Sequence, residues 1–148
     1  MRRHIALALL LALTLLIASP ACAARDTGTV TVVRVVDGDT IDIAGGFRLR
    51  YIGMDSPEVG QPYYAEATEA NRRLVQGRTV RLESDMSEKD QYSRLLRYVY
   101  VGGDFVNLEL VRMGWAVAKS YPPDIKYHEL FEGAERDAKL ANRGQWAQ

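Results

Sequence analysis

Four carboxylates fall at the ends of neighbouring extended segments, where a hairpin fold would gather some of them. Asp37 and Asp39 flank a glycine in a turn, and Asp55 and Glu58 come at and after the end of segment 47–54. Carboxylates held close together repel one another unless a cation or hydrogen bonds offset their charge. Oxygen donors with no His or Cys nearby favour a hard ion, Ca²⁺ or Mg²⁺, over zinc. The pattern therefore indicates a divalent-cation site, although Asp-Gly-Asp also occurs simply as a hairpin turn.

Two arginines stand where they could hold an anion beside such an ion. Arg50 lies within segment 47–54, and Arg94 closes the run Asp-Gln-Tyr-Ser-Arg at 90–94, just before another extended segment. A planar guanidinium forks onto phosphate oxygens through two parallel hydrogen bonds, so two arginines near a cation would suit a phosphate group. The plainer interpretation of an arginine at the start of a strand is a solvated surface charge.

The elements that must position these side chains are mostly short strands. Runs rich in Val and Thr, separated by Gly-containing turns, predict five strands, and apolar residues at helical spacing predict three helices. So many short strands in so short a chain favour an α+β fold, mainly β, with helices packed on a small closed barrel. Alternation within 47–54 places Arg48, Arg50 and Ile52 on one face. The expected strands are 29–36, 40–43, 47–54, 79–82 and 95–101, and the expected helices are 63–75, 106–113 and 127–142.

The first 23 residues differ in character from the rest of the chain. Arg2 and Arg3 precede a mainly apolar, uncharged stretch of 14 residues at 5–18, and Ala21 and Ala23 form a small-residue pair. A membrane-spanning helix needs about 20 apolar residues, so residues 1–23 are predicted to be a secretory signal peptide cleaved after Ala23. Residues 24–148 then form one domain, with no repeat or linker that would mark a second.

The charge balance limits how this domain could bind nucleic acid. The chain has 19 basic and 19 acidic residues, and loss of Arg2 and Arg3 with the signal leaves a formal charge of −2. The basic excess of proteins that grip duplex DNA through bulk electrostatics is missing, so any such role must rest on local charges. The single cysteine, Cys22, lies in the predicted signal, where a lipid anchor is the alternative. The predicted mature domain therefore has no disulfide.

Five motifs occur in order between residues 27 and 146, and each is weak alone. Together, in this order and spacing, they resemble the staphylococcal nuclease family. The motifs are Asp-Gly-Asp-Thr at 37–40, Arg-x-x-Gly-x-Asp-x-Pro-Glu at 50–58, Asp-x-Tyr-x-Arg at 90–94, Leu-Val-Arg-Met-Gly at 110–114 and Gly-x-Trp at 144–146.

The resemblance implies a five-stranded oligonucleotide-binding (OB-fold) barrel with three helices. It also implies calcium-dependent hydrolysis of DNA and RNA that leaves 3′-phosphate and 5′-hydroxyl ends. Carried over residue by residue, it assigns the Ca²⁺ ligands, the phosphate-binding arginines and the general base. The ligands are Asp39, Asp55 and the backbone carbonyl of Ser56; Arg50 and Arg94 hold the scissile phosphate; Glu58 is the base and reaches the ion through water.

The run at 90–94 departs from the family pattern at two positions. Gln91 replaces a lysine and removes one cation near the phosphate, and Ser93 replaces a glycine, which matters if the backbone there needs a positive φ. Tyr92 and Tyr121 are the predicted substrate contacts, because exposed aromatic rings stack on bases without sequence preference. For either tyrosine, packing in the barrel or a loop is the plainer alternative.

These observations favour a secreted or periplasmic enzyme, a Ca²⁺-dependent phosphodiesterase acting on DNA and RNA. We expect preference for single strands, a monomer, and no stable membrane association after signal cleavage. The alternative is a non-catalytic OB-fold module that binds nucleic acid or protein. Asp39, Asp55, Arg50, Glu58 and Arg94 occur together in this chain, which argues for the enzyme.

Overall fold

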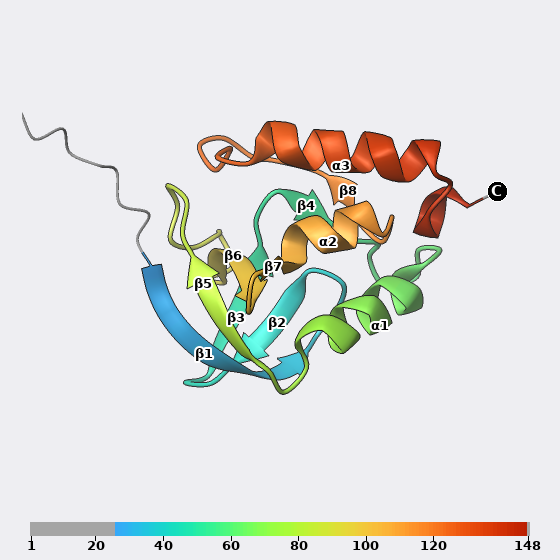
Figure 1. Ribbon diagram of the computed structural model, residues 1–148. Helices are drawn as coiled ribbons and strands as arrows, with labels where there is room; N and C mark the ends of the chain where they lie inside the picture. Colours follow the sequence, from blue (N-terminus) through green and yellow to red (C-terminus); the bar gives the residue numbers. More distant parts are fainter. Residues whose placement is uncertain (1–25, 148) are drawn as a thin grey trace, which may run out of the picture.

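A five-stranded barrel forms the centre of the molecule (Figure 1). The computed structural model describes residues 26–147, and the predicted signal peptide at 1–23 lies outside the described residues. The strands follow the order β3-β2-β1-β5-β6, and a parallel pairing of β3 with β6 closes the circle. The predicted OB-fold barrel is confirmed. Its strands are β1 (Asp26–Val35), β2 (Thr40–Ile43), β3 (Phe47–Tyr51), β5 (Thr79–Glu83) and β6 (Leu95–Val101).

The closing pairing matters for the position of the two arginines. Parallel register sets Leu49 opposite Leu95 and Arg50 opposite Leu96. Arg50 lies on β3, and Arg94 directly precedes Leu95, the first residue of β6, so both arginines lie at this seam. Residues more than forty positions apart in the chain are thereby brought to the same side of the barrel.

Three helices pack on and beside the barrel, as predicted. In Figure 1, α2 lies between α3 and the barrel, and α1 lies beside α2. An aromatic cluster joins these layers: Tyr98 of β6 lies with its ring centroid 4.8 Å from that of Tyr127, and Phe105 lies 5.6 Å from Phe131. Such pairs contribute about 0.5–1.5 kcal/mol each beyond their buried area. The helices are α1 (Tyr64–Val75), α2 (Val106–Arg112) and α3 (His128–Leu140), followed by a 3-10 turn at Gly144–Trp146.

The prediction of one strand over 47–54 is wrong at its end. β3 stops at Tyr51, the chain turns at Gly53 with φ of 83°, and it resumes as β4 (Met54–Asp55). β4 pairs with β8 (Val117–Ala118) and not with the barrel. A further two-residue strand, β7 (Asp104–Phe105), precedes α2. The turn at Gly53 thus moves Asp55 out of the barrel wall.

Period-two alternation holds within β3, where Leu49 and Tyr51 are buried and Arg48 and Arg50 are not, and it fails only at Ile52. Ile52 lies beyond the end of β3 and is buried in the core. Arg48 pairs with Asp42 on β2, 2.8 Å from Nε to Oδ1, whereas Arg50 is turned toward carboxylates at the strand ends. Within residues 26–147, no helix is both long and apolar enough to cross a membrane.

Replacing Gly53 by alanine should destabilise the fold strongly. The added Cβ would collide with the ring of Phe131, and the positive φ disfavours any residue with a Cβ. Strain of about 1–2 kcal/mol and overpacking of about 1–3 kcal/mol should lower the free energy of unfolding together. Urea denaturation measures the change.

Gly46→Ala is the matched control for Gly53→Ala. Gly46 has a nearly identical φ of 81°, and a Cβ there would meet nothing within 4 Å. It should lose only the strain contribution. Equal losses in the two variants would show that contact with Phe131 does not constrain the turn.

Candidate active site

Arg50 joins two carboxylates that come from different segments of the chain. Its Nη1 donates to Oδ1 of Asp39, and its Nη2 donates to Oδ1 of Asp55. The register of β2 with β3 sets Thr40 opposite Arg50, which places Asp39 beside the guanidinium. The Arg50 side chain is 14% exposed and that of Asp39 only 1%. The expected gathering of carboxylates is therefore seen for Asp39 and Asp55, and a guanidinium offsets their repulsion.

Asp39 is held rigidly in this arrangement. Its Oδ2 accepts hydrogen bonds from the Ser56 backbone N–H at 2.8 Å and from Ser56 Oγ at 2.9 Å. Thr40 Oγ1 donates to Oδ1 at 3.0 Å. Burial raises the pKa of Asp39 to about 6; the Arg50 guanidinium opposes that rise, and neighbouring Asp37 adds to it. A carboxylate so deeply buried needs a cation beside it to stay ionised.

The turn that carries Asp39 depends on a close approach at Gly38. A Cβ at Gly38 would lie 2.6 Å from Cβ of Ser56, so only glycine allows Ser56 to reach Asp39. Asn71 of α1 anchors the turn from the other side, since its Nδ2 donates to the Asp37 carbonyl at 2.8 Å. The Asp-Gly-Asp sequence is here both a hairpin turn and part of the site.

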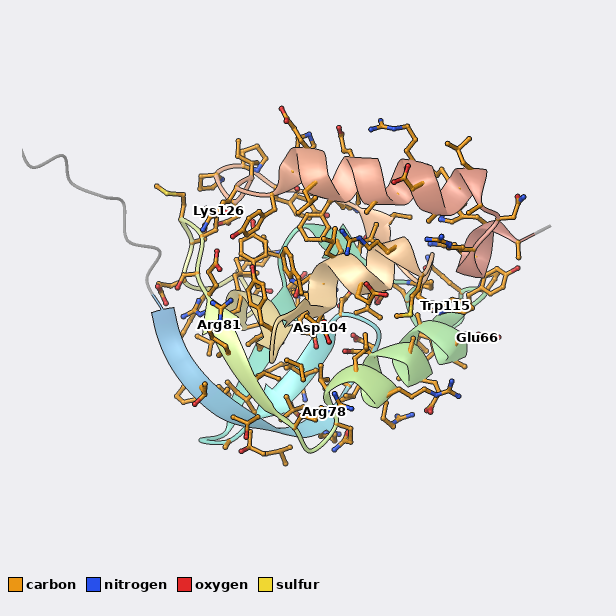
Figure 2. All side chains as sticks on the ribbon, viewed as in Figure 1. Glu66, Arg78, Arg81, Asp104, Trp115 and Lys126 are labelled. Atoms are coloured by element: carbon orange, nitrogen blue, oxygen red, sulfur yellow. The ribbon has the colours of Figure 1, made fainter. Side chains whose placement is uncertain are left out.

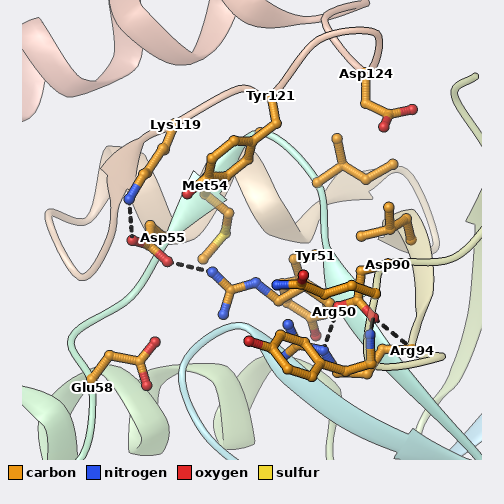
Figure 3. A pocket seen from close by; sticks show the side chains of 15 residues that line it. Arg50, Tyr51, Met54, Asp55, Glu58, Asp90, Arg94, Lys119, Tyr121 and Asp124 are labelled. Atoms are coloured by element: carbon orange, nitrogen blue, oxygen red, sulfur yellow. Dashed lines mark hydrogen bonds and ion pairs between the residues drawn. The ribbon is translucent and has the colours of Figure 1, made fainter. Parts of the chain in front are cut away.

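An open cavity of about 680 Å³ lies beside this ion-pair group (Figure 3). That volume is in the range of small-molecule sites. Asp39 and Ser56 are buried and lie outside the lining of this cavity. Six of the eight residues predicted from sequence line the cavity together: Arg50, Asp55, Glu58, Tyr92, Arg94 and Tyr121.

Arg94 reaches the cavity from a loop that Asp90 closes. Asp90 Oδ1 accepts from the backbone N–H groups of Tyr92 at 2.9 Å and Arg94 at 3.0 Å. Its Oδ2 accepts from Arg94 Nε at 2.6 Å. Burial alone would raise the pKa of Asp90, but these hydrogen bonds outweigh it and hold the pKa below its usual value. Arg94 is thus a restrained side chain rather than a freely solvated one.

The Ser93 substitution falls at a position that strains the backbone. Ser93 has φ of 65°, in the left-handed region that glycine adopts at little cost. The residue also contributes to the loop closure, because its N–H donates to the Asp90 carbonyl at 3.1 Å. The backbone at Ser93 therefore does need a positive φ, the condition under which the replacement of glycine was expected to matter.

Glu58 has a different environment from the other acids of the cavity. It lies on the exposed segment between β4 and α1, where its backbone N–H donates to Gln61 Oε1 at 2.7 Å. Among residues 26–147, no hydrogen bond or ion pair engages its carboxylate, whereas Asp55 and Asp90 are each paired with cations (Figure 3). The Glu58 carboxylate is thus free to accept a proton or to hold a water molecule.

Tyr92 and Tyr121 are surface residues, which excludes the alternative that they pack in the barrel. Tyr92 is 70% exposed and Tyr121 is 59% exposed. Each ring lies near a cation: the Arg94 guanidinium carbon is 5.4 Å from the Tyr92 ring centroid, and Lys119 Nζ is 5.5 Å from that of Tyr121. Both tyrosines line the cavity and are exposed to solvent.

Lys119 is a charged residue of the cavity that sequence reasoning missed. Its Nζ lies 3.1 Å from Asp55 Oδ2, and its backbone N–H donates to the Gly53 carbonyl at 2.9 Å. The pairing of β4 with β8 brings Lys119 beside Asp55 across more than sixty residues. Two-residue strands leave no periodic signal in the sequence, so no pattern could have indicated this neighbour.

The donor set fits a hard cation. Asp39 and Asp55 offer carboxylate oxygens, and Ser56 adds a backbone carbonyl in the segment bonded to Asp39. Within the described part of the chain, no three His, Cys, Asp or Glu side chains are gathered closely enough to hold a metal by themselves. An ion at this position would complete its shell with backbone oxygen, water or substrate. The metal assignment of these three residues stays a prediction.

Comparison with known proteins decides the family. The model of the family described as staphylococcal nuclease homologue matches residues 48–148. The chain belongs to the staphylococcal nuclease family. A thermonuclease of Staphylococcus hyicus is 40% identical over 128 residues, which cover 80% of this chain and 76% of that protein. A thermonuclease of Staphylococcus intermedius is 40% identical over 124 residues, with coverage of 78% and 74%. The prediction of a nuclease, a hydrolase of phosphoric esters, is confirmed at this level.

More distant relatives are also similar over the same region. Endonuclease YncB of Bacillus subtilis (strain 168) is 37% identical over 129 residues, which cover 80% of this chain and 61% of that protein.

The segment between β8 and α3 of this nuclease is fixed to the barrel by acidic residues. Glu83 Oε1 accepts from Lys126 Nζ at 2.6 Å and from the Tyr127 hydroxyl at 2.8 Å. Asp124 Oδ1 accepts from the Ser87 backbone N–H at 2.7 Å. Figure 2 shows Lys126 of this segment near the end of β5, the strand that carries Glu83. These contacts position Tyr121 at the cavity.

Ser93→Gly should stabilise this nuclease. Glycine adopts the φ of 65° without the left-handed penalty of about 1–2 kcal/mol, and its greater freedom in the unfolded chain cancels part of that gain. We expect the free energy of unfolding to rise by roughly 0.5–1 kcal/mol in urea denaturation. Ser120→Gly, at a position where φ is not positive, is the control and should not stabilise. A destabilised Ser93→Gly variant would contradict the strain.

Proposed function

We propose that this nuclease is a calcium-dependent phosphodiesterase that cleaves DNA and RNA and leaves 3′-phosphate ends. The carrying observation is that Arg50, engaged with both Asp39 and Asp55, lines one cavity with Arg94 and the unpaired carboxylate of Glu58. An anion-binding pair, a cation-binding pair and a free base are what hydrolysis of a phosphodiester requires.

The arginines suit the charge that develops during the reaction. A phosphodiester is an anion, and attack on phosphorus gathers further negative charge on its equatorial oxygens. Arg50 and Arg94 are both restrained by carboxylates, so their donors are oriented before substrate arrives. Groups that bind more strongly in the transition state than in the ground state raise the rate of the chemical step.

Glu58 suits the role of general base. In the proposed step it takes a proton from a water molecule, and the water oxygen forms the new bond to phosphorus. The bond from phosphorus to the 5′ oxygen breaks, and that oxygen leaves with the electron pair and takes a proton from solvent. The phosphate then remains on the 3′ side. The exposed position of Glu58 and its unpaired carboxylate support this assignment.

Calcium would be held by Asp39, Asp55 and the Ser56 carbonyl. A divalent cation supplies positive charge at the phosphate oxygens and lowers the pKa of bound water. Asp55 shares its two oxygens between Arg50 and Lys119, so its carboxylate is already fixed at the edge of the cavity. The oxygen-only donor set supports Ca²⁺ as the cofactor.

Single-stranded substrates suit this surface better than duplexes. Tyr92 and Tyr121 present exposed rings, and stacking contributes about 1–3 kcal/mol per base in single-strand binding proteins. The predicted mature chain has no basic excess with which to hold a duplex. We further propose that the enzyme is a monomer, secreted or periplasmic, on the basis of its N-terminal sequence pattern for export.

Cleavage should require calcium. The mature chain is incubated with denatured DNA or with RNA in Ca²⁺, in Mg²⁺ and with chelator, and products are resolved by gel. We expect rapid cutting in Ca²⁺ and none with chelator, because the buried carboxylates need the ion to bind phosphate productively. Cleavage that survives chelation would exclude the metal mechanism. Binding without cleavage in Ca²⁺ would favour the non-catalytic module instead.

Glu58→Gln and Arg94→Ala should each lower turnover by about 10²–10³, since one removes the base and the other a donor to the transition state. Steady-state kinetics on a single-stranded oligonucleotide measures the loss, and thermal unfolding verifies the fold. Glu66→Gln and Arg73→Ala on α1 are the controls; Arg73 pairs with Glu69 through Nε as Arg94 pairs with Asp90. Turnover close to that of the parent would remove the assignment of the residue concerned.

A further inference from the structure

Lys119 is held at the cavity by its backbone, and its side chain is half-exposed. The pairing of β4 with β8 and the hydrogen bond from its N–H to the Gly53 carbonyl fix its main chain beside Asp55. Its side chain is 47% exposed and ends 3.1 Å from Asp55 Oδ2. A lysine is a point charge with three donors on a flexible stem, so this ammonium can turn to another anion within reach.

The charges around Asp55 are balanced while its carboxylate is paired with both Arg50 and Lys119. Asp39 and Asp55 together offset Arg50 and Lys119. The proposed ion would take the oxygens of both carboxylates and add two positive charges. Arg50 and Lys119 would then face the cavity without sufficient counter-charge, and anionic phosphate groups are the partners that restore the balance.

A cation beside an exposed tyrosine ring occurs twice in the cavity, once on each side of Arg50. Arg94 lies near the ring of Tyr92, and Lys119 lies near the ring of Tyr121, at 5.4 and 5.5 Å. Figure 3 shows Lys119 and Tyr121 on one side of Arg50 and Arg94 on the other. A cation beside an exposed ring suits one nucleotide, with phosphate on the cation and base on the ring. Two such combinations suit two consecutive nucleotides.

We infer that Lys119 binds the phosphate next to the scissile one, with the adjoining base on Tyr121. The inference rests on the proposed function and deepens it: the recognised substrate is a strand with at least two consecutive phosphates. Lys119 is then a substrate-binding residue and not merely a clamp on Asp55.

Binding of a fluorescent oligo(dT) in Ca²⁺ tests the inference. A Glu58→Gln background slows cleavage by about 10²–10³, so the strand stays largely intact during the measurement. Lys119→Gln should weaken binding roughly 3- to 10-fold and reduce the slope of log affinity against log salt by about 0.7, the value for one lost phosphate contact. Lys119→Arg should retain both the affinity and the slope, because it keeps the charge.

Lys139→Gln is the matched control. Lys139 is 48% exposed, its Nζ lies 3.1 Å from Glu135 Oε2, and it lies over the ring of Trp146, but it does not line the cavity. Its loss should leave affinity and slope unchanged. Equal losses in the two variants would mean that only bulk charge matters, and an unaltered Lys119→Gln would exclude the contact; either outcome overturns the inference.

Substrate variants separate a direct contact from an effect through Asp55. A single neutral methylphosphonate is placed at each position of the strand in turn. At one position next to the scissile phosphate it should weaken binding by the parent but not by Lys119→Gln, since the contact is already lost. If the losses add at every position, or if Lys119→Gln lowers only turnover, Lys119 acts through Asp55 and the inference is wrong. Absence of cleavage by the parent in Ca²⁺ would overturn the proposed function separately, because binding is measured without cleavage.

Discussion

The engagement of Arg50 by Asp39 and Asp55 is the interaction on which the site depends. It places three charged groups from the turn before β2, from β3 and from β4 within hydrogen-bonding distance, with Asp39 almost wholly buried. Charges removed from water are costly unless they are paired, and removal of one partner of a buried pair typically costs about 3–5 kcal/mol. The barrel ends, the turn at Gly38 and the break at Gly53 all serve to keep these three groups together.

Most of the barrel could be predicted because its strands and helices carry strong local patterns. The segments at β1, β2, β5 and β6 alternate or run with β-branched residues, and the three helices show apolar stripes. The break at Gly53 could not be predicted, since the run Phe-Arg-Leu-Arg-Tyr-Ile-Gly-Met continues the strand pattern across it. The strand ends where Gly53 takes a positive φ, and the ring of Phe131, a residue of α3 that only the tertiary fold brings near, occupies the space that a Cβ at Gly53 would need.

The candidate site shows the same division. Asp39, Asp55, Arg50, Glu58 and Arg94 were recognisable from residue type, spacing and family resemblance. The role of Asp90 in closing its loop was not, because one carboxylate accepting three N–H donors is a matter of backbone conformation. Lys119 was invisible for a similar reason, since it enters through the pairing of two dipeptide strands. Lys119 and Arg94 are cations on opposite sides of Arg50 in the cavity. Gln91, which also lines the cavity, carries no charge.

The parallel seam between β3 and β6 ties the chemistry to the closure of the barrel. Arg50 and Arg94 are neighbours only while Leu49 faces Leu95. This pairing joins β3 and β6, which are the first and last strands in the order around the barrel. Sub-global opening, such as the loss of the β3–β6 pairing alone, costs less than complete unfolding. The two guanidinium groups would part in such an excursion even with the helices and the other ladders intact. The position of both arginines at one cavity is therefore a property of the closed barrel, and it is lost when the β3–β6 pairing opens.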